Sequence, residues 1–415
     1  MTTTYDTIVA GAGPAGSTAA RLLAQRGARV LLLDKQRFPR DKPCGGGVTL
    51  RAASLLDVDL SPVIERTVHG ARFSLRLGET FDRRFEQPLT YMTQRCRLDA
   101  YLAERAAAAG ADVHDGEALR SASFGAAAGA PTAVLRHAVH VDTESAEYRA
   151  RVLIGADGAN GIVGRSFEVR TEYEEAVALE GNVPFTPDIP AEWQDFVGLD
   201  LGGMAGGYGW VFPKSDHLNV GVGAWKYAGF TLRPKLSELA RRYGFDESRL
   251  VNLRGHHLPV RVPGSPIVRG PVALVGDAAG LVDPLSGEGI HMAFASARLA
   301  AEEAMHVLAD ERFGMEAYQG AVDRDLQPEL TVSRQLQELF NFAPPPYLAI
   351  MRRSEKFWRF FCHLIRGELT YLDFVRTIGP LRGAMDYFAA VAARRRLDRV
   401  EQGLRQMSGS ALRAG

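Results

Sequence analysis

The first 34 residues constrain the fold more than any other part of the chain. A short apolar run leads directly into Gly11-Ala-Gly13-Pro-Ala-Gly16, which has the spacing G-x-G-x-x-G. Small residues to about Arg26 predict a helix, and a second apolar run then ends in Asp34. This order of strand, glycine turn, helix, strand and acid is typical of a dinucleotide-binding unit. The sequence therefore predicts an α/β fold built on a parallel sheet.

Each residue of this motif has a physical role in holding a dinucleotide. Gly11 permits the tight turn, Gly13 lets the backbone approach a pyrophosphate, and Gly16 lets the helix pack against the strand. Asp34 is placed to accept hydrogen bonds from the ribose hydroxyls of an adenosine. A glycine turn that bound no ligand would not explain the acid.

A second glycine motif lies more than two hundred residues later, in the stretch VALVGDAAGLVDPLSGEGI over residues 272–290. An apolar strand ends in Gly276-Asp277, and the chain enters a helix through Gly287-Glu-Gly289. The carboxylate of Asp277 can accept from a polyol hydroxyl, and the helix start offers backbone N–H groups to an electron-rich ligand atom. We expect this stretch to complete the dinucleotide site.

A third signal follows a predicted strand over residues 150–154. Here Asp157-Gly158 leads to Arg165, an arrangement that can cap a pyrophosphate and direct a cation along it. By itself the segment favours an ordinary strand-to-turn junction, and the prediction depends on the two other motifs.

Composition excludes several classes of function and location. The net charge is zero, so nothing in it indicates a nucleic-acid partner. The three cysteines are odd in number and widely spaced, which argues against a disulfide framework and predicts a reducing cytoplasm. No apolar run is long enough to span a membrane. His256-His257 has no carboxylate or cysteine at ligand spacing, so we predict no metal site.

The three glycine motifs, in this order, resemble those of flavoprotein monooxygenases and their relatives, in which the ligand is FAD. Lys42-Pro-Cys44-Gly45-Gly-Gly47 and Gly207-Tyr208-Gly-Trp210-Val-Phe212-Pro213 narrow the resemblance to the geranylgeranyl reductase family, which saturates double bonds in long isoprenoid chains. The resemblance covers residues 1 to about 330. Ala205 stands where the family often has proline, and Gly161 stands where it often has serine.

The resemblance and the motifs together give a set of predicted site residues. Those proposed to bind FAD are Gly11, Gly13, Ala15, Gly16, Asp34, Lys35, Cys44, Gly45, Gly47, Arg95, Ala118, Asp157, Gly276, Asp277, Gly287, Gly289 and Ile290. Those proposed to be catalytic are Cys44, Tyr208 and Trp210.

The fold that the resemblance implies is a Rossmann-type FAD-binding domain with an inserted antiparallel-sheet substrate domain and a C-terminal helical region. The FAD-binding domain would consist of residues 1–75, 92–170 and 266–335. The substrate domain would consist of residues 76–91 and 171–265, and the helical region of residues 336–415. Alternating apolar and polar residues over 172–262 favour the inserted antiparallel strands, and residues 232–243 predict one helix among them.

The implied activity is an FAD-dependent reductase acting on CH–CH groups, with a long-chain isoprenoid substrate and electrons from NADPH or another reductant. Two alternatives stay open. A flavin-dependent monooxygenase or halogenase would share the fold, although the halogenase motif normally reads Trp-x-Trp-x-Ile-Pro. A non-catalytic flavin or lipid carrier would bind FAD that no physiological donor reduces.

Tyr208 and Trp210 alternate along a predicted strand, so their rings share one face, and Phe212 would extend it to an aromatic wall. Core packing is the ordinary explanation of such a stripe, but the glycines around it leave room for a ligand. Cys44 precedes three glycines in a loop, where a reactive or flavin-contacting thiol is expected.

Residues 347–366 mix aromatic with basic side chains. They predict an amphipathic helix that either lies on a bilayer or packs across the mouth of the substrate tunnel. The location predicted for the protein is cytoplasmic, with peripheral contact to the inner face of the membrane. Arg394-Arg395-Arg396 lies on a helical tail and is predicted to be a solvated face. The sequence indicates no oligomeric state.

Overall fold

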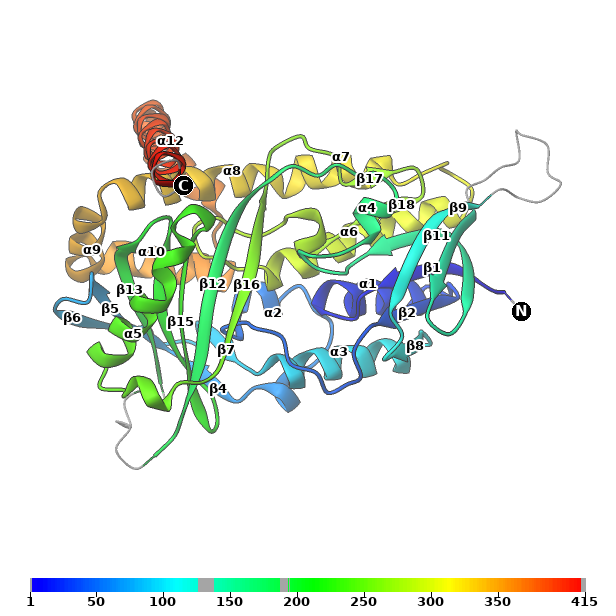
Figure 1. Cartoon of the computed structure of the whole chain (residues 1–415), viewed down its shortest axis with the longest axis horizontal. Coiled ribbons are helices and arrows are strands. Elements are labelled where there is room, and N and C mark those ends of the chain that lie inside the picture. The colour runs from blue at the N-terminus through cyan, green and yellow to red at the C-terminus, as the bar shows by residue number, and fades with distance from the viewer. Residues whose placement is uncertain (1, 126–137, 187–192, 194, 412–415) are drawn as a thin grey trace.

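The structure is a computed structural model that describes residues 2–125, 138–186, 193 and 195–411. Two sheets lie toward opposite ends of an elongated molecule, and the long strands β12 and β16 form the edge of one sheet that lies nearest the other (Figure 1). Helices that follow residue 290 cover the length of the molecule. The predicted fold class, an α/β chain with a Rossmann-type unit, an antiparallel sheet and C-terminal helices, is confirmed.

The first sheet contains eight strands: six follow the order β17-β18-β11-β1-β2-β8, β10 also pairs with β11, and β9 pairs with β10. The pairs of β1 with β2 and β11, of β2 with β8, and of β11 with β18 are parallel. Its strands are β1 (Thr3–Ala10), β2 (Val30–Asp34), β8 (Asp112–Asp115), β9 (Leu119–Gly125), β10 (Ala138–Thr143), β11 (Glu147–Gly155), β17 (Val268–Arg269) and β18 (Val272–Leu274). Apolar runs such as Val30–Asp34 are buried throughout, as expected of parallel strands covered on both faces.

Helix α1 (Pro14–Gln25) begins at the glycine turn and packs against α3 (Arg95–Ala108) and α6 (Ile290–Leu308). A Cβ on Gly16 would lie 1.7 Å from the Gly11 carbonyl oxygen. Gly11 itself has a φ of +102°, which side-chain-bearing residues rarely adopt. The turn therefore needs glycine at both positions, and it delivers the N-terminus of α1 to the carboxyl ends of β1 and β2.

The second sheet has seven strands in the order β16-β12-β15-β14-β13-β5-β6. They are β5 (Gly70–Leu75), β6 (Thr80–Arg84), β12 (Tyr173–Pro184), β13 (Phe196–Met204), β14 (Gly207–Pro213), β15 (His217–Trp225) and β16 (Val251–Arg261). All neighbours are antiparallel except β13 and β5, which pair in parallel. β5 comes from an earlier part of the chain and reaches β13 by a crossover, so no hairpin joins the two.

The predicted division into domains has its first boundary at residue 75. Strand β5 ends there, and its two partners, β13 and β6, belong to the seven-stranded sheet. Hydrogen bonding therefore places residues 70–75 with the inserted sheet, because the sequence pattern of a single short strand does not say which sheet it joins. A third sheet, β3-β7-β4, joins β3 (Gly47–Thr49), β7 (Thr90–Met92) and β4 (Arg66–Val68).

The C-terminal part is helical, as predicted. It consists of α7 (Glu316–Asp325), α8 (Gln327–Phe342), α9 (Pro344–Arg353), α10 (Glu355–Arg366), α11 (Tyr371–Ile378) and α12 (Arg382–Ala411). Helix α12 projects from the body of the molecule in Figure 1. Within the part of the chain that the structure describes, none of the helices combines the length and apolar character needed to cross a bilayer.

Two expectations about this part were wrong. Residues 347–366 form two helices and not one, because Ser354 leaves the helical conformation and caps α10 through its side chain. The apolar face of α10 turns inward: Trp358 is fully buried and donates from Nε1 to the Arg84 carbonyl at 2.7 Å. The predicted solvated face of residues 394–396 is wrong at Arg396 alone. Arg394 and Arg395 are exposed, whereas Arg396 bonds Glu338 at 2.8 Å and stacks on Trp225 at 5.2 Å.

Candidate functional site

One large cavity, with a volume of about 1210 Å³, runs along the inward face of the seven-stranded sheet to the carboxyl ends of the parallel strands. The lining residues come from positions as far apart as 10 and 374. Every predicted site residue lines it except Gly16, which is buried in the packing of α1. The cavity has two parts, which we call the motif arm, lined by the three glycine motifs, and the apolar arm, lined by β5, β13, α9 and α10.

The first glycine motif forms one end of the motif arm. A Cβ on Gly13 would lie 3.8 Å from Nη2 of both Arg40 and Arg95, so the start of α1 opens between two guanidinium groups. Bare helix N–H groups and two arginines suit a pyrophosphate. The residues present therefore fit the dinucleotide that the motif predicts.

The arginines belong to a buried network with two acids. Arg40 donates to Asp34 at 3.0 Å and to Asp99 at 2.8 Å. Arg95 donates twice to Asp99, both at 2.7 Å. Asp34 also accepts from the Ala12 N–H at 2.9 Å, which ties it to the glycine turn. Burial opposes the charge of Arg95, but Asp99 outweighs this effect and raises the arginine's pKa. Sequence reasoning missed Arg40 and Asp99.

The motif around Asp157 forms a helix cap. Its Oδ2 accepts from the N–H groups of Ile162 at 2.6 Å and Val163 at 2.9 Å, at the start of α4 (Val163–Ser166). Burial raises the pKa of Asp157, and its Oδ1 has no hydrogen-bond partner in the described part of the chain. Arg165 is exposed and does not line the cavity, so the predicted capping cation is wrong.

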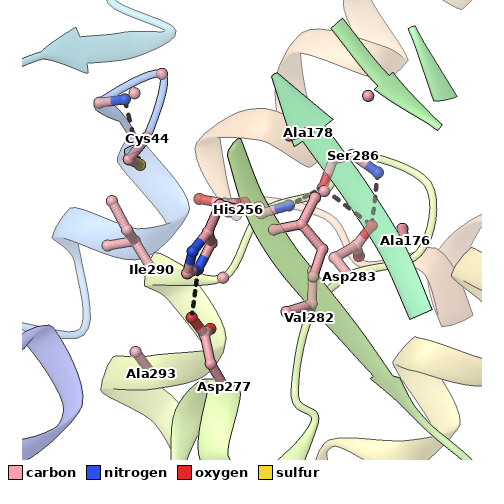
Figure 2. A pocket seen from close by; sticks show the side chains of 18 of the residues that line it. Cys44, Ala176, Ala178, His256, Asp277, Val282, Asp283, Ser286, Ile290 and Ala293 are labelled. Atoms are coloured by element: carbon pink, nitrogen blue, oxygen red, sulfur yellow. Dashed lines mark hydrogen bonds and ion pairs between the residues drawn. The ribbon is translucent and has the colours of Figure 1, made fainter. Parts of the chain in front are cut away.

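Asp277, in the second glycine motif, is an ionised carboxylate at the cavity wall. It receives the Lys42 ammonium at 2.9 Å, and His256 Nε2 lies 3.6 Å from its Oδ2. Figure 2 shows the His256 ring, from β16, pointing at Asp277 across the cavity. Burial opposes the charge, but Lys42 and His256 outweigh it and hold the pKa of Asp277 well below its usual range. Neither partner was predicted.

The loop after Asp277 folds around Asp283, which accepts from the N–H groups of Leu285 at 3.0 Å and Ser286 at 2.8 Å (Figure 2). Gly287 follows with a φ of +70°. Glu288 then accepts from the Thr49 hydroxyl at 2.6 Å, and burial raises the pKa of Glu288 to about 7. The loop therefore brings a readily protonated carboxyl group to the cavity wall.

The aromatic wall, Tyr208, Trp210 and Phe212, lies where the two arms meet. Ring centroids are 6.1 Å apart for Tyr208 and Trp210, and 6.2 Å apart for Trp210 and Phe212. The prediction that the three rings share one face is confirmed, because all three line the cavity. Tyr208 donates to the Ser286 carbonyl and Trp210 Nε1 to Asn219 at 2.7 Å. These bonds fix the rings.

The loop Cys44–Gly47 covers this wall. A Cβ on Gly45 would lie 2.8 Å from the Phe212 ring and 3.3 Å from Trp210 Nε1, so only glycine allows this approach. The Cys44 N–H donates to Glu180 Oε1 at 2.7 Å, and the buried Lys214 donates to the Gly45 carbonyl at 2.6 Å. Sequence reasoning missed both partners, although Glu180 directly follows the apolar run of residues 176–179 and Lys214 directly follows Phe212-Pro213.

The apolar arm extends from the aromatic wall between the second sheet and α9 and α10. Apart from the backbone it presents almost entirely hydrocarbon and aromatic surface. Its lining includes Val68, Ala71, Phe73, Leu89, Met92, Val197, Leu199, Leu201, Leu348, Met351, Phe357, Trp358, Phe361, Leu364 and Ile365. The 347–366 segment was predicted to lie either on a bilayer or across the mouth of the substrate tunnel. In the structure it packs across this arm.

His256 and His257 lie on β16, as expected of strand residues. Among the described residues there is no cluster of three or more histidine, cysteine, aspartate or glutamate side chains suited to a metal ion.

Both the sequence and the fold of this chain are similar to those of known proteins. Residues 4–201 match the family described as FAD binding domain. The chain is 31% identical over 362 residues to the chloroplastic geranylgeranyl diphosphate reductase of Oryza sativa subsp. japonica, a match that covers 80% of this chain and 74% of the relative.

A geranylgeranyl bacteriochlorophyll reductase-like protein of Thermoplasma acidophilum has a similar solved structure. The TM-score is 0.71 at 25% identity, over 83% of this chain and 89% of that one. The flavin-dependent brominase Bmp2 superimposes with a TM-score of 0.68 at 18% identity, covering 88% and 94% of the two chains. The brominase shares the fold, and at this identity the likeness says nothing more.

Proposed function

Because the chain belongs to the geranylgeranyl reductase family of FAD-dependent oxidoreductases, we propose that it saturates C=C bonds in a polyprenyl chain. The observation that carries this proposal is the continuity of the cavity. A motif arm suited to FAD and an apolar arm suited to an isoprenoid chain meet at the aromatic wall. Reduced FAD, formed by NADPH or another donor, would supply hydride to the alkene.

The predicted cofactor residues are assigned to FAD as follows. The first glycine motif, with Arg40 and Arg95, would hold the pyrophosphate, and Asp34 the adenosine ribose. Asp277 would accept from the ribityl hydroxyls. The remaining proposed contacts line the same arm: Ala15, Lys35, Cys44, Gly45, Gly47, Ala118, Asp157, Gly276, Gly287, Gly289 and Ile290.

The apolar arm would bind the isoprenoid through surface that excludes water. An isolated alkene is not polarised, so hydride adds only once a proton has created positive charge at the other carbon. The ring faces of Tyr208 and Trp210 would stabilise that charge, an effect worth up to about 2 kcal/mol at a desolvated site. Cys44, at the edge of the wall, would tune the chemistry at the flavin.

An anaerobic assay tests the proposal. Dithionite-reduced protein is mixed with geranylgeranyl diphosphate, and in parallel with a geranylgeranylated lipid. Flavin reoxidation is followed by absorbance and the products by mass spectrometry. We expect products that have gained hydrogen only. Trp210→Ala should slow flavin reoxidation by the alkene about 30-fold, the rate equivalent of the ring's stabilisation, while reduction of the flavin by its donor changes little. Trp210→Phe should restore part of the rate.

A flavin-dependent monooxygenase or halogenase is the second candidate, because the brominase shares the fold. Oxygen dependence separates the two. Products that form only in the presence of dioxygen, and that contain new oxygen or halogen, would replace the reductase proposal with this one. A carrier would hold FAD that none of the donors reduces.

A further inference from the structure

Glu180, on β12, is a buried acid at the cavity wall, and the proposed alkene reduction gives it no role so far. Its side chain is 8% exposed and lines the cavity. Its Oε1 accepts from the Cys44 N–H at 2.7 Å. We propose that Glu180 is the proton donor for alkene saturation, an inference that rests on the proposed function.

The register of the second sheet places Glu180 beside the aromatic wall. Trp210 pairs with Gly221, and Gly221 pairs with Glu180, so the three form one row across β14, β15 and β12. A Cβ on Gly221 would lie 2.1 Å from Trp210 Cζ2, because the indole lies over the glycine. The missing side chain at position 221 therefore lets the Trp210 ring lie over β15, toward the acid on their shared face of the sheet.

On the far side of Trp210 the row continues to Leu199 of β13, which lines the apolar arm. A chain held in that arm and reaching the aromatic wall thus arrives next to the acid. Trp210 would face the carbon that becomes positively charged, and Glu180 would face the carbon that receives the proton.

The surroundings of Glu180 keep its proton available near neutral pH. Burial raises the pKa of this carboxyl group to about 7, opposed by the Cys44 N–H and by Lys214. Asp41, in the loop before Cys44, acts in the same direction as burial. The other groups that face it are Asn219 on β15, which lowers the pKa, and Arg254, its register partner on β16, which is paired with Asp41 at 2.8 Å. An acid with a pKa close to the working pH is the best general acid.

Three other groups of the cavity are less suited to give the proton. The Tyr208 hydroxyl already donates to the Ser286 carbonyl, and burial raises the pKa of Tyr208, which makes it a weaker acid. The Cys44 thiol is an intrinsically weaker acid than a carboxylic acid. Glu288 is the strongest competitor, because its pKa is also raised to about 7, but its carboxylate is bonded to the Thr49 hydroxyl and lies outside the row.

The reaction balances with these groups. One carbon of the alkene takes the proton of the Glu180 carboxylic acid, and the other takes hydride supplied by reduced flavin. The C=C bond becomes a single bond, the alkene is reduced by two electrons and the flavin is oxidised. Glu180 is left as a carboxylate and takes a proton from water before the next turnover.

Glu180→Gln tests the inference, because glutamine keeps the acceptor for the Cys44 N–H and lacks the acidic proton. With dithionite-reduced protein and geranylgeranyl diphosphate under anaerobic conditions, we expect flavin reoxidation about 100-fold slower than in the parent. Reoxidation by dioxygen and FAD content should be unchanged. In the parent, the alkene step should be fast below pH 7 and slow above it as Glu180 ionises, and the variant should lose this dependence.

Infrared spectroscopy of the oxidised protein gives a readout independent of turnover. Carboxylic acid C=O absorption should be lost as the pH rises through about 7 in the parent, and Glu180→Gln should lack the share of Glu180 and keep that of Glu288. Asp200→Asn is the matched control: Asp200 is buried on the opposite face of the same sheet, and asparagine can keep its bonds from Ser74 and the Leu77 N–H. This variant should retain the Glu180 band and the parent rate.

The outcomes are distinct. If the alkene never reoxidises the flavin of the parent protein, both the proposed function and the donor role of Glu180 are contradicted. A parent that reduces the alkene, with Glu180→Gln equally fast, ends the inference alone. A loss seen in Glu288→Gln and not in Glu180→Gln would assign the proton to the competitor.

Discussion

At the scale of single residues, Asp277 is held by side chains from two other parts of the chain. Lys42 comes from the loop after β2 and His256 from β16, and both contact the same carboxylate oxygen. Since Lys42 and His256 hold the pKa of Asp277 well below its usual range, the carboxylate can act as a charged acceptor for a polyol at any ordinary pH.

Asp277→Ala should therefore lower the FAD content of the purified protein sharply. A charge-assisted hydrogen bond contributes about 1.5–3 kcal/mol, so FAD affinity should fall by at least tenfold, measured by flavin absorbance and equilibrium titration. Asp277→Asn keeps an acceptor and should lose less. Full FAD content in both variants would remove Asp277 from the cofactor site.

Cys44 is placed by its backbone more than by its side chain: its N–H is bonded to Glu180, and its Sγ accepts from the Gly46 N–H at 3.4 Å. Cys44→Ser retains that geometry, because a hydroxyl can accept the same bond. We expect nearly normal FAD content and slower alkene reduction. If Cys44→Ser reduces the alkene at the parent rate in stopped-flow measurements, Cys44 has a structural role only.

At the scale of elements, strand β15 makes room for the Trp210 ring because it has glycine at position 221. Gly221→Ala would force the new Cβ into the Trp210 ring, whereas at Gly223 the nearest Trp210 atom would be 3.8 Å from a Cβ, an ordinary contact. Overpacking of this kind costs about 1–3 kcal/mol. Gly221→Ala should lower the free energy of unfolding by that amount, and Gly223→Ala, the matched control, should not. Denaturant titration with tryptophan fluorescence measures both.

Helix α10 closes the apolar arm through Trp358, which packs edge-on against Phe73 with ring centroids 6.1 Å apart. Trp358→Ala should cost about 3–5 kcal/mol of stability, as for other buried aromatic residues. Trp358→Phe keeps most of the packing and loses the bond to the Arg84 carbonyl, so about 1 kcal/mol is expected. Equal losses in calorimetry would mean that the hydrogen bond, and not the ring, holds the helix.

At the scale of the whole molecule, the two buried carboxyls link stability to pH. Glu180 and Glu288 have pKa values of about 7 in the folded protein, against 4.5 for the ordinary side chain. Between these values the folded state binds protons that the unfolded state has released. The contribution of these two groups to the free energy of unfolding should therefore fall as the pH rises from about 4.5 to 7, by about 3 kcal/mol for each group. Burial lowers the pKa of His291 to about 3, so the contribution of this group rises over part of the same range.

Glu180→Gln should flatten this dependence by one group's share, measured as denaturant midpoints across that pH range. Asp277 acts in the opposite sense: its lowered pKa gives stability that is present above the ordinary value and lost in acid. A Glu180→Gln variant with the same pH dependence of stability as the parent would contradict the assignment of Glu180.

The sequence by itself determined the fold class and the location of the cofactor motifs. Gly11, Gly16 and Asp34 act within one βαβ unit, and strand and helix periodicity is a local property, so these features can be read from neighbouring residues. The alternation of Tyr208, Trp210 and Phe212 likewise predicted one shared face, which the structure confirms.

Only the tertiary structure decided which residues meet across the cavity. Glu180 lies 136 residues from Cys44 and Lys42 lies 235 from Asp277, and such contacts depend on sheet register and on loop paths that no local pattern encodes. The same holds for α10. Its amphipathic sequence fits a bilayer or a protein interior equally well, and it was the hydrophobic surface of β5 and β13, arriving from elsewhere in the chain, that buried Trp358.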